Sequence, residues 1–232
     1  MKKFIVSQKK IRAEQHQVNG YQLGYDISRY RDTLFADANI EMPAHIQRSV
    51  IKRKAEFLAG RIAAHLCLED LHIKDFQIAS NQDRSPVWPD EITGSISHSN
   101  QTACCLVAQK HSIRGIGIDL ESIIATDLLD SILNTVVNQA ELAILAQLSD
   151  DIYQQVSLIF SAKESLFKAL YPEARKFFDF SAAELISIDL NTQHFCLELK
   201  EDLSIAWKIG MQISGYFEFF EQYVFTRIII PK

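Results

Sequence analysis

Apolar residues recur along the chain with two different periods, and these periods separate helices from strands. After Pro43, apolar positions return every three to four residues for about 20 residues, which predicts a long helix. The same period runs from about Asp151 to Leu170 and predicts a second long helix that stops before Pro172. Asn138 followed by Glu141 has the spacing of a capping box and predicts the start of a shorter helix.

Short apolar runs bounded by turn residues predict the strands, and the shorter helix is expected to end near Leu148. The predicted strands are 4–6, 21–25, 73–79, 94–99, 102–109, 114–120, 185–190, 194–199, 205–209, 216–220 and 224–230. Runs 102–109 and 114–120 are expected to pair antiparallel across the intervening turn, and Asn191-Thr192 fits a hairpin turn. Strands and helices in this order predict an α+β protein with two halves of similar size that meet near residue 120.

Composition narrows the class of protein. With 47% hydrophobic and 23% charged residues among 232, the chain can bury a sizeable core, so disorder is not expected. A net charge of −5 argues against a general nucleic-acid binder. The four cysteines include no C-x-x-C pair, so neither a disulfide framework nor a zinc site is expected. No signal-peptide or transmembrane run is present, and a cytoplasmic protein is expected.

Two acids close together suggest the first candidate chemistry. Asp119 and Glu121 are two residues apart at the end of a predicted strand, so both point to one face with Cα atoms roughly 6.5 Å apart. Leu120 between them should point into the core. The pair suits either a solvated strand end or a hard divalent cation such as Mg²⁺, which binds carboxylates and substrate phosphates.

The second long helix offers a further acid and a base. Glu164 and Lys168 share a helix face at i, i+4 spacing, which fits an ordinary ion pair or a third metal ligand beside a phosphate-binding lysine. His98, next to Ser97, fits a structural hydrogen bond or a phosphate contact. Basic residues on the first long helix fit a solvated face or an anion site.

Five motifs in a fixed order carry a resemblance. They are 52–61 (KRKAEFLAGR), 84–89 (RSPVWP), 94–99 (GSISHS), 117–121 (GIDLE) and 160–170 (FSAKESLFKAL). In this order they resemble the motifs of the 4′-phosphopantetheinyl transferases of the large, pseudo-dimeric Sfp/EntD-type branch, and most nearly its enterobactin-type members. The residue at Phe160 is tryptophan in many relatives, and Phe is a mild change at a packing position.

The resemblance implies a fold and an organisation. It implies two similar α/β subdomains in a pseudo-two-fold arrangement, each a small antiparallel sheet packed with helices. Residues 1–118 would form the N-terminal subdomain, with contacts to the adenine and 3′-phosphate of coenzyme A (CoA). Residues 119–232 would form the C-terminal subdomain, with the metal and the catalytic helix. The active site would lie in the cleft between them, complete in a monomer.

The resemblance also implies a reaction, in which a serine of an apo carrier protein attacks the β-phosphate of CoA and 3′,5′-ADP leaves. The implied metal ligands are Asp119, Glu121 and Glu164. The implied CoA-phosphate contacts are Lys168, His98 and Ser97. The implied adenine contacts are Arg84, Ser85 and Pro86. The 3′-phosphate contact would come from the helix that carries Arg53 and Arg61, and either arginine fits.

Glu164 is the candidate base, with Lys168 as its catalytic partner. Mg²⁺ is the expected ion, and Mn²⁺ could replace it. The expected partners are acyl, peptidyl or aryl carrier proteins of siderophore (enterobactin) or other non-ribosomal peptide synthesis, with fatty-acid carriers as the fallback. Residues 123–133 fit either a carrier-binding patch or ordinary core. The rival functions are a Mg²⁺-dependent nucleotide pyrophosphohydrolase and a non-catalytic carrier-binding protein.

Overall fold

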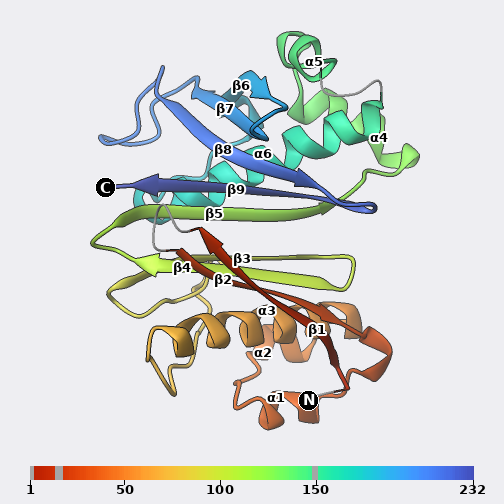
Figure 1. Cartoon of the computed structure of the whole chain (residues 1–232), viewed down its shortest axis with the longest axis vertical. Coiled ribbons are helices and arrows are strands. Elements are labelled where there is room, and N and C mark those ends of the chain that lie inside the picture. Colours follow the sequence, from red (N-terminus) through yellow and green to blue (C-terminus); the bar gives the residue numbers. More distant parts are fainter. Residues whose placement is uncertain (1–2, 14–17, 148–150) are drawn as a thin grey trace. The chain divides into compact units, whose positions relative to one another are not determined.

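The computed structural model describes residues 3–13, 18–147 and 151–232, drawn in Figure 1. The chain divides into two compact units, residues 1–114 with 231–232, and residues 115–230. The sequence analysis set the division between residues 118 and 119. The roles assigned to the two halves, and their pseudo-symmetry, stay predictions.

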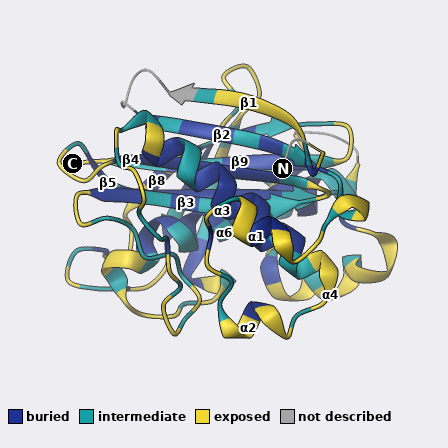
Figure 2. Ribbon diagram, turned by 90° about the horizontal axis from the view of Figure 1, so that it is seen from below, coloured by how far each residue is buried: buried dark blue, intermediate teal, exposed yellow. Residues whose placement is uncertain are grey.

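The first unit is a four-stranded antiparallel sheet in the order β1-β2-β4-β3. Its elements are β1 (Ile5–Ala13), β2 (Val18–Tyr25), a 3₁₀ turn (Ile27–Arg29), α1 (Thr33–Asp37), α2 (Ala44–Gln47), α3 (Ile51–Asp70), β3 (Ile92–Ser99) and β4 (Thr102–Gln109). Helix α3 packs against one face of the sheet (Figure 1), with Leu58, Leu23 and Cys105 in a shared core. In Figure 2, α3 is coloured largely as buried, whereas the edge strand β1 is largely exposed.

The second unit is a five-stranded sheet in the order β5-β9-β8-β7-β6. Its elements are β5 (Ile113–Ser122), α4 (Thr126–Val136), α5 (Gln139–Leu145), α6 (Ile152–Ala174), a 3₁₀ turn (Phe180–Ala182), β6 (Ala183–Asp189), β7 (His194–Leu199), β8 (Gln212–Phe219) and β9 (Tyr223–Pro231). Leu166 of α6 packs with Leu197 and Ile228 of the sheet in a second core. The α+β class, with antiparallel sheets packed with helices, is therefore confirmed.

Local signals gave several elements correctly. Asn138 and Glu141 form the predicted capping box, each side chain bonded to the other's backbone N–H at 2.9 Å. Strands β6 and β7 form a hairpin around Asn191, whose N–H bonds to Asp189 Oδ1 at 2.9 Å. Helix α5 ends at Leu145. The predicted end near Leu148 lies outside the described residues.

The predicted pairing of 102–109 with 114–120 was wrong. Strand β4 has β2 along one edge and β3 along the other, so no edge of β4 is left for β5. Strand β5 joins the other sheet beside β9 instead. The turn at 110–113 therefore passes from one unit to the next and closes no hairpin.

Two predicted strands are irregular segments. In 73–79 the backbone bonds locally, with Ala79 N–H donating to the carbonyl of Gln77, and the neighbouring Ser80 makes only an isolated bridge to Pro86. In 205–209 the chain turns back, because the N–H groups of Leu203 and Ser204 both donate to the carbonyl of Trp207.

The predicted helix ends also needed correction. The helix after Pro43 is interrupted between α2 and α3, where the Ser49 hydroxyl bonds back to the carbonyl of His45 at 2.9 Å. Helix α6 continues through Pro172 to Ala174 and ends with Arg175 in the left-handed conformation (φ 51°). The missing N–H of Pro172 falls in the last turn, so a single bond is lost there.

Candidate active site

Strand β5 brings two acids to one end of the second unit's sheet. Asp119 is 6% exposed, and Glu121 follows on the same strand face. Leu120 is 3% exposed, as expected for a side chain on the opposite face. The strand alternation inferred from the sequence therefore sets the direction of both carboxylates.

Helix α6 lies against β5 at unusually short range. A Cβ at Gly117 would lie 1.8 Å from the carbonyl oxygen of Ser165 and 2.6 Å from the backbone nitrogen of Ala169. The hydroxyl of Ser165 bonds Thr226 Oγ1 of β9 at 2.7 Å, within the buried interface. Small residues thus let the helix backbone touch the sheet backbone, and this close packing sets the distance between the helix side chains and the acids of β5.

Lys168 of α6 reaches the acids directly. Its ammonium donates to Asp119 Oδ1 at 2.7 Å and to the carbonyl of Ile118 at 3.0 Å. Glu164, one turn earlier on the same helix, is half-buried. The structure thus brings Asp119, Glu121, Glu164 and Lys168 together within one unit.

The carboxylates affect one another electrostatically. Burial, and then the negative charge of Asp119, raise the pKa of Glu121 to about 7. Burial is also the main cause that raises the pKa of Glu164; the charge of Asp119 adds to it, and Lys168 opposes it. Negative charge is therefore concentrated here beyond what Lys168 offsets.

The donor set fits a hard divalent cation. Three carboxylates supply the oxygen ligands that Mg²⁺ prefers, and a cation among them would relieve the repulsion that raises the pKa of Glu121. Among the residues described, no three His, Cys, Asp or Glu side chains already stand in a ligand cluster. In this arrangement Lys168 offsets part of the charge of Asp119 through Oδ1.

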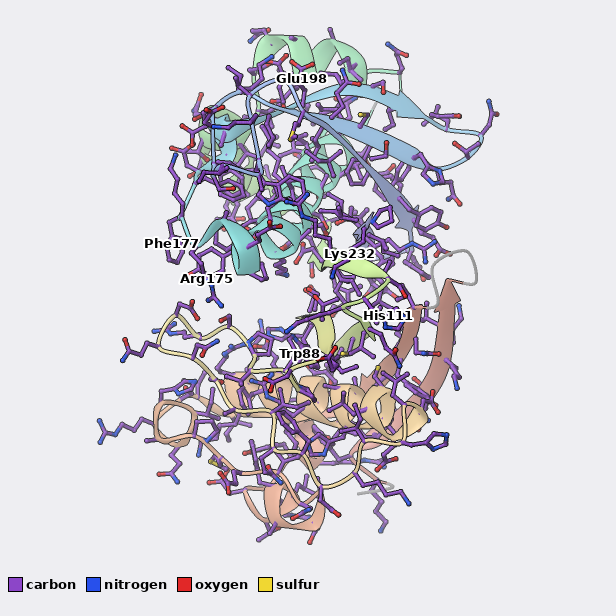
Figure 3. The ribbon with its side chains drawn as sticks, turned by 90° about the vertical axis from the view of Figure 1, so that its left-hand side faces the viewer. Trp88, His111, Arg175, Phe177, Glu198 and Lys232 are labelled. Atoms are coloured by element: carbon purple, nitrogen blue, oxygen red, sulfur yellow. The ribbon has the colours of Figure 1, made fainter. Side chains whose placement is uncertain are left out.

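An aromatic pocket opens beside Glu164. It is lined by Phe167, Phe177, Phe178 and Lys163. The Phe167 ring contacts those of Phe177 and Phe178 at centroid distances of 5.5 and 5.1 Å. Phe177 is 70% exposed and lies with Arg175 beyond the end of α6 (Figure 3). The sequence analysis missed this pocket, because its walls come from both sides of the helix end.

In the first unit, β3 presents the predicted phosphate-binding turn. Ser97 and His98 lie near its end, before the hairpin residues Asn100 and Gln101, which both have positive φ. Arg53 of α3 lies beside the imidazole, with Nη1 2.6 Å from His98 Nε2. The structure thus joins two sequence-predicted residues, Arg53 and His98, in one cluster.

The two arginines of α3 have different environments. The Arg53 side chain is 41% exposed, whereas Arg61 is 6% exposed and lies over the Phe57 ring at 4.5 Å. Arg61 donates to Ser80 Oγ at 3.1 Å, at the start of the 81–90 loop. In that loop, Ser85 bonds Asp83 through its N–H and hydroxyl at 2.9 and 2.6 Å. Arg61 therefore anchors the loop that carries Arg84, Ser85 and Pro86.

A buried ion pair supports α6, and sequence reasoning missed it. Lys163 donates to Glu141 Oε1 at 2.8 Å and to the carbonyl of Val136 at 2.7 Å, and Glu141 is fully buried. Glu141 Oε1 also accepts from the N–H of Leu185 at 2.9 Å. The capping-box signal identified Glu141 but not its lysine partner, which lies far along the chain.

Comparisons with known proteins match both units. A family model described as "4'-phosphopantetheinyl transferase N-terminal domain" matches residues 41–108, and one described as "4'-phosphopantetheinyl transferase superfamily" matches residues 115–226. Enterobactin synthase component D of Escherichia coli (strain K12) is 40% identical over 126 residues, covering 54% of this chain and 59% of that protein. The 4'-phosphopantetheinyl transferase Svp of Streptomyces mobaraensis is 36% identical over 148 residues, covering 62% and 59%.

The matches span about three fifths of the length of these relatives. A solved holo-(acyl-carrier-protein) synthase of Bacillus anthracis str. Ames, in complex with CoA (3',5'-ADP), aligns at a TM-score of 0.36 with 16% identity. That alignment covers 52% of this chain and 98% of the other, and a score this low supports no conclusion about the site. No helix in the described part of the chain is long and apolar enough to cross a bilayer.

Proposed function

This chain belongs to the 4′-phosphopantetheinyl transferase superfamily, and from that premise we propose that it transfers 4′-phosphopantetheine from CoA to a serine of an apo carrier protein. The products are the holo-carrier and 3′,5′-ADP. One observation carries the proposal: Lys168 and Glu164 of α6 meet Asp119 and Glu121 of β5 at one site. Such a set of charges suits a diphosphate.

Asp119, Glu121 and Glu164 would hold Mg²⁺ or Mn²⁺. When bound, the ion would neutralise charge on the diphosphate, which is the main requirement of phosphoryl transfer. Lys168, one turn from Glu164 on α6, would then bind a phosphate oxygen beside the ion.

Glu164 accepts the proton of the attacking serine, directly or through a water. Burial raises the pKa of this carboxyl in the protein without the ion, and a bound cation would oppose that rise, so Glu164 would accept the proton through the oxygen that does not bind the ion. The serine oxygen forms a bond to the β-phosphorus while the bond from that phosphorus to the bridging oxygen breaks. The bridging oxygen leaves with 3′,5′-ADP.

CoA contacts also come from the first unit. His98, Ser97 and Arg53 would bind phosphate oxygens. Arg84, Ser85 and Pro86 would line the adenine site on a loop that is anchored by Arg61. Arg53, the more exposed arginine, suits direct contact with the 3′-phosphate, whereas Arg61 is largely enclosed by protein.

The aromatic pocket beside Glu164 suits the pantetheine arm of CoA. That arm is a flexible chain of methylene and amide groups, and the Phe167, Phe177 and Phe178 rings offer it an apolar wall. The arm would then extend from the phosphates into the pocket and away from the attacking serine.

The proposed acceptor is a carrier protein of siderophore or other non-ribosomal peptide synthesis. The enzyme itself is proposed to act as a monomer in the cytoplasm. Residues 123–133 offer the carrier one exposed apolar side chain, Leu128 on α4. The same helix bears Asp127 and Asp130, whose negative charge would repel an acidic helix of the carrier. Exposed Phe177, next to Arg175 and Lys176, combines an apolar side chain with positive charge, which suits an acidic helix better.

Intact mass spectrometry tests the proposal. Apo carrier proteins from siderophore and fatty-acid systems are incubated with CoA, Mg²⁺ and this protein. A gain of one phosphopantetheine on a serine, with release of 3′,5′-ADP, is expected for one of them. Release of free phosphopantetheine without any acceptor would instead assign the site to a pyrophosphohydrolase and refute the transferase.

A further inference from the structure

The contact between Arg53 and His98 determines the protonation of the imidazole. Arg53 Nη1 lies 2.6 Å from His98 Nε2. A guanidinium has only donors and stays protonated at any ordinary pH, so Nε2 has to be the acceptor. The ring is therefore neutral in this arrangement, and its one N–H is on Nδ1.

The Nδ1 edge of the ring faces Glu56. Glu56 Oε2 lies 3.6 Å from His98 Nδ1 and 3.6 Å from Arg53 Nη1, and its side chain is 13% exposed. At this distance the carboxylate acts on both groups through its charge, and a small rotation closes either hydrogen bond. Burial, and then the charge of Glu56, raise the pKa of buried Tyr25, and the charge of Arg53 opposes this rise. Tyr25 therefore lies close to both Glu56 and Arg53.

We infer that Glu56 is a positioning residue for His98 and Arg53. It holds the Nδ1–H edge of the ring, so that Nε2 is presented first to Arg53 and then to a phosphate oxygen of CoA. The second half of this inference rests on the proposed function. Partners that orient a metal-ligating histidine change affinity by about 10- to 100-fold when they are removed, and we expect an effect at the lower end of this range for His98.

The exchange at Nε2 requires a proton as well as a new partner. A phosphate oxygen accepts hydrogen bonds, so Nε2 must become a donor, and the ring takes up one proton from solvent. The imidazolium then carries a positive charge between Glu56 and the phosphate, and the carboxylate offsets part of it. Arg53, released from Nε2, is free to bind the same anion.

The first test uses the protein without CoA. Long-range ¹H–¹⁵N spectra of the histidine rings distinguish the two neutral tautomers, and His98→Asn identifies the signals. The wild type is expected to show the Nδ1–H tautomer. Glu56→Ala should lose this single form, because Glu56 lies 3.6 Å from both Arg53 and the ring and its removal lets Arg53 move away from Nε2. Glu56→Gln should keep more of it, because an amide oxygen can accept a hydrogen bond from Nδ1–H. The control is Glu69→Ala, an exposed position about 20 Å further along α3.

The second test measures transfer kinetics with the same variants. Glu56→Ala should raise KM for CoA about tenfold and leave kcat within about twofold, because the positioned groups bind ground state and transition state alike. Glu56→Gln should show a smaller rise, and Glu69→Ala none. Urea unfolding of each variant separates these effects from lost stability.

The outcomes separate the inference from the proposed function. If the wild type transfers nothing to any carrier, the proposed function fails, and the tautomer spectra alone decide the role of Glu56. If the wild type transfers phosphopantetheine, an Nδ1–H signal that persists in Glu56→Ala together with an unchanged KM would overturn the inference. A loss in kcat at constant KM would overturn it too.

Discussion

The close contact between α6 and β5 makes Gly117→Ala the sharpest perturbation of the site. The new Cβ would lie 1.8 Å from the carbonyl oxygen of Ser165, whereas ordinary contact begins at 3.4 Å. The helix must therefore retreat by about 1.6 Å along that line. The obstacle is backbone on a buried helix, so no side-chain rotation relieves it.

This retreat has two costs. Overpacking of a core typically costs about 1–3 kcal/mol, and a backbone clash belongs at the upper end, about 3 kcal/mol. Glu164 and Lys168 move with the helix while Asp119 stays on β5. A misplacement of about 1 Å can cost about 10²-fold in rate, so we expect a loss of that order in carrier modification.

Two measurements check the prediction, with Gly24→Ala as the control. Urea unfolding gives the free energy of unfolding, and intact mass against time gives the transfer rate. At Gly24 a Cβ would meet the Ser7 hydroxyl at 2.4 Å, a side-chain end that can rotate away. The rotation gives up the bond that this hydroxyl accepts from the Gly24 N–H at 3.1 Å, so a loss of about 1 kcal/mol and an unchanged transfer rate are expected. If Gly117→Ala unfolds at the wild-type urea concentration and transfers at the wild-type rate, then α6 does not set the site geometry as argued.

Four further perturbations follow from single contacts. Glu164→Gln should transfer nothing measurable, even at Mg²⁺ and CoA concentrations that calorimetry shows to saturate the variant; near-normal turnover would rule out Glu164 as the base. Lys163→Met leaves Glu141 buried without its ammonium partner and should lower the free energy of unfolding by about 3–5 kcal/mol in urea. The double variant Lys163→Met/Glu141→Gln should recover part of this loss. A Lys163→Met protein as stable as the wild type would contradict the prediction. Bonds from Thr192 and Asn191 lower the pKa of Asp189 below 3.8, so its carboxylate stabilises the fold above pH 3.8 and loses this effect as pH falls. Asp189→Asn should therefore lose less stability than the wild type as the solution is made acidic. Parallel curves of unfolding free energy against pH for the two proteins would contradict this. Phe177→Ala should raise KM for CoA with little change in unfolding, since the ring is 70% exposed, and an unchanged KM would remove the pocket from the CoA site.

Local rules on the sequence determined much of the fold. The 3.6-residue period located α3 and α6, because a helix that packs on a sheet must keep one apolar face. The two-residue period of a strand aimed Asp119 and Glu121 away from Leu120. The capping box marked the start of α5, because its two hydrogen bonds lie within four residues. Each of these features depends on neighbours in the chain alone.

The tertiary structure decided what depends on partners distant in sequence. Strand β5 pairs with β9, more than 100 residues later, because both edges of β4 are occupied. Lys168 pairs with Asp119, and Lys163 with Glu141, because α6 lies against the sheet and against the chain that leads to it. Glu56 lies beside His98 because β3 packs against α3. A sequence pattern sets the direction of a side chain along its own element, but which other element it meets is determined by packing.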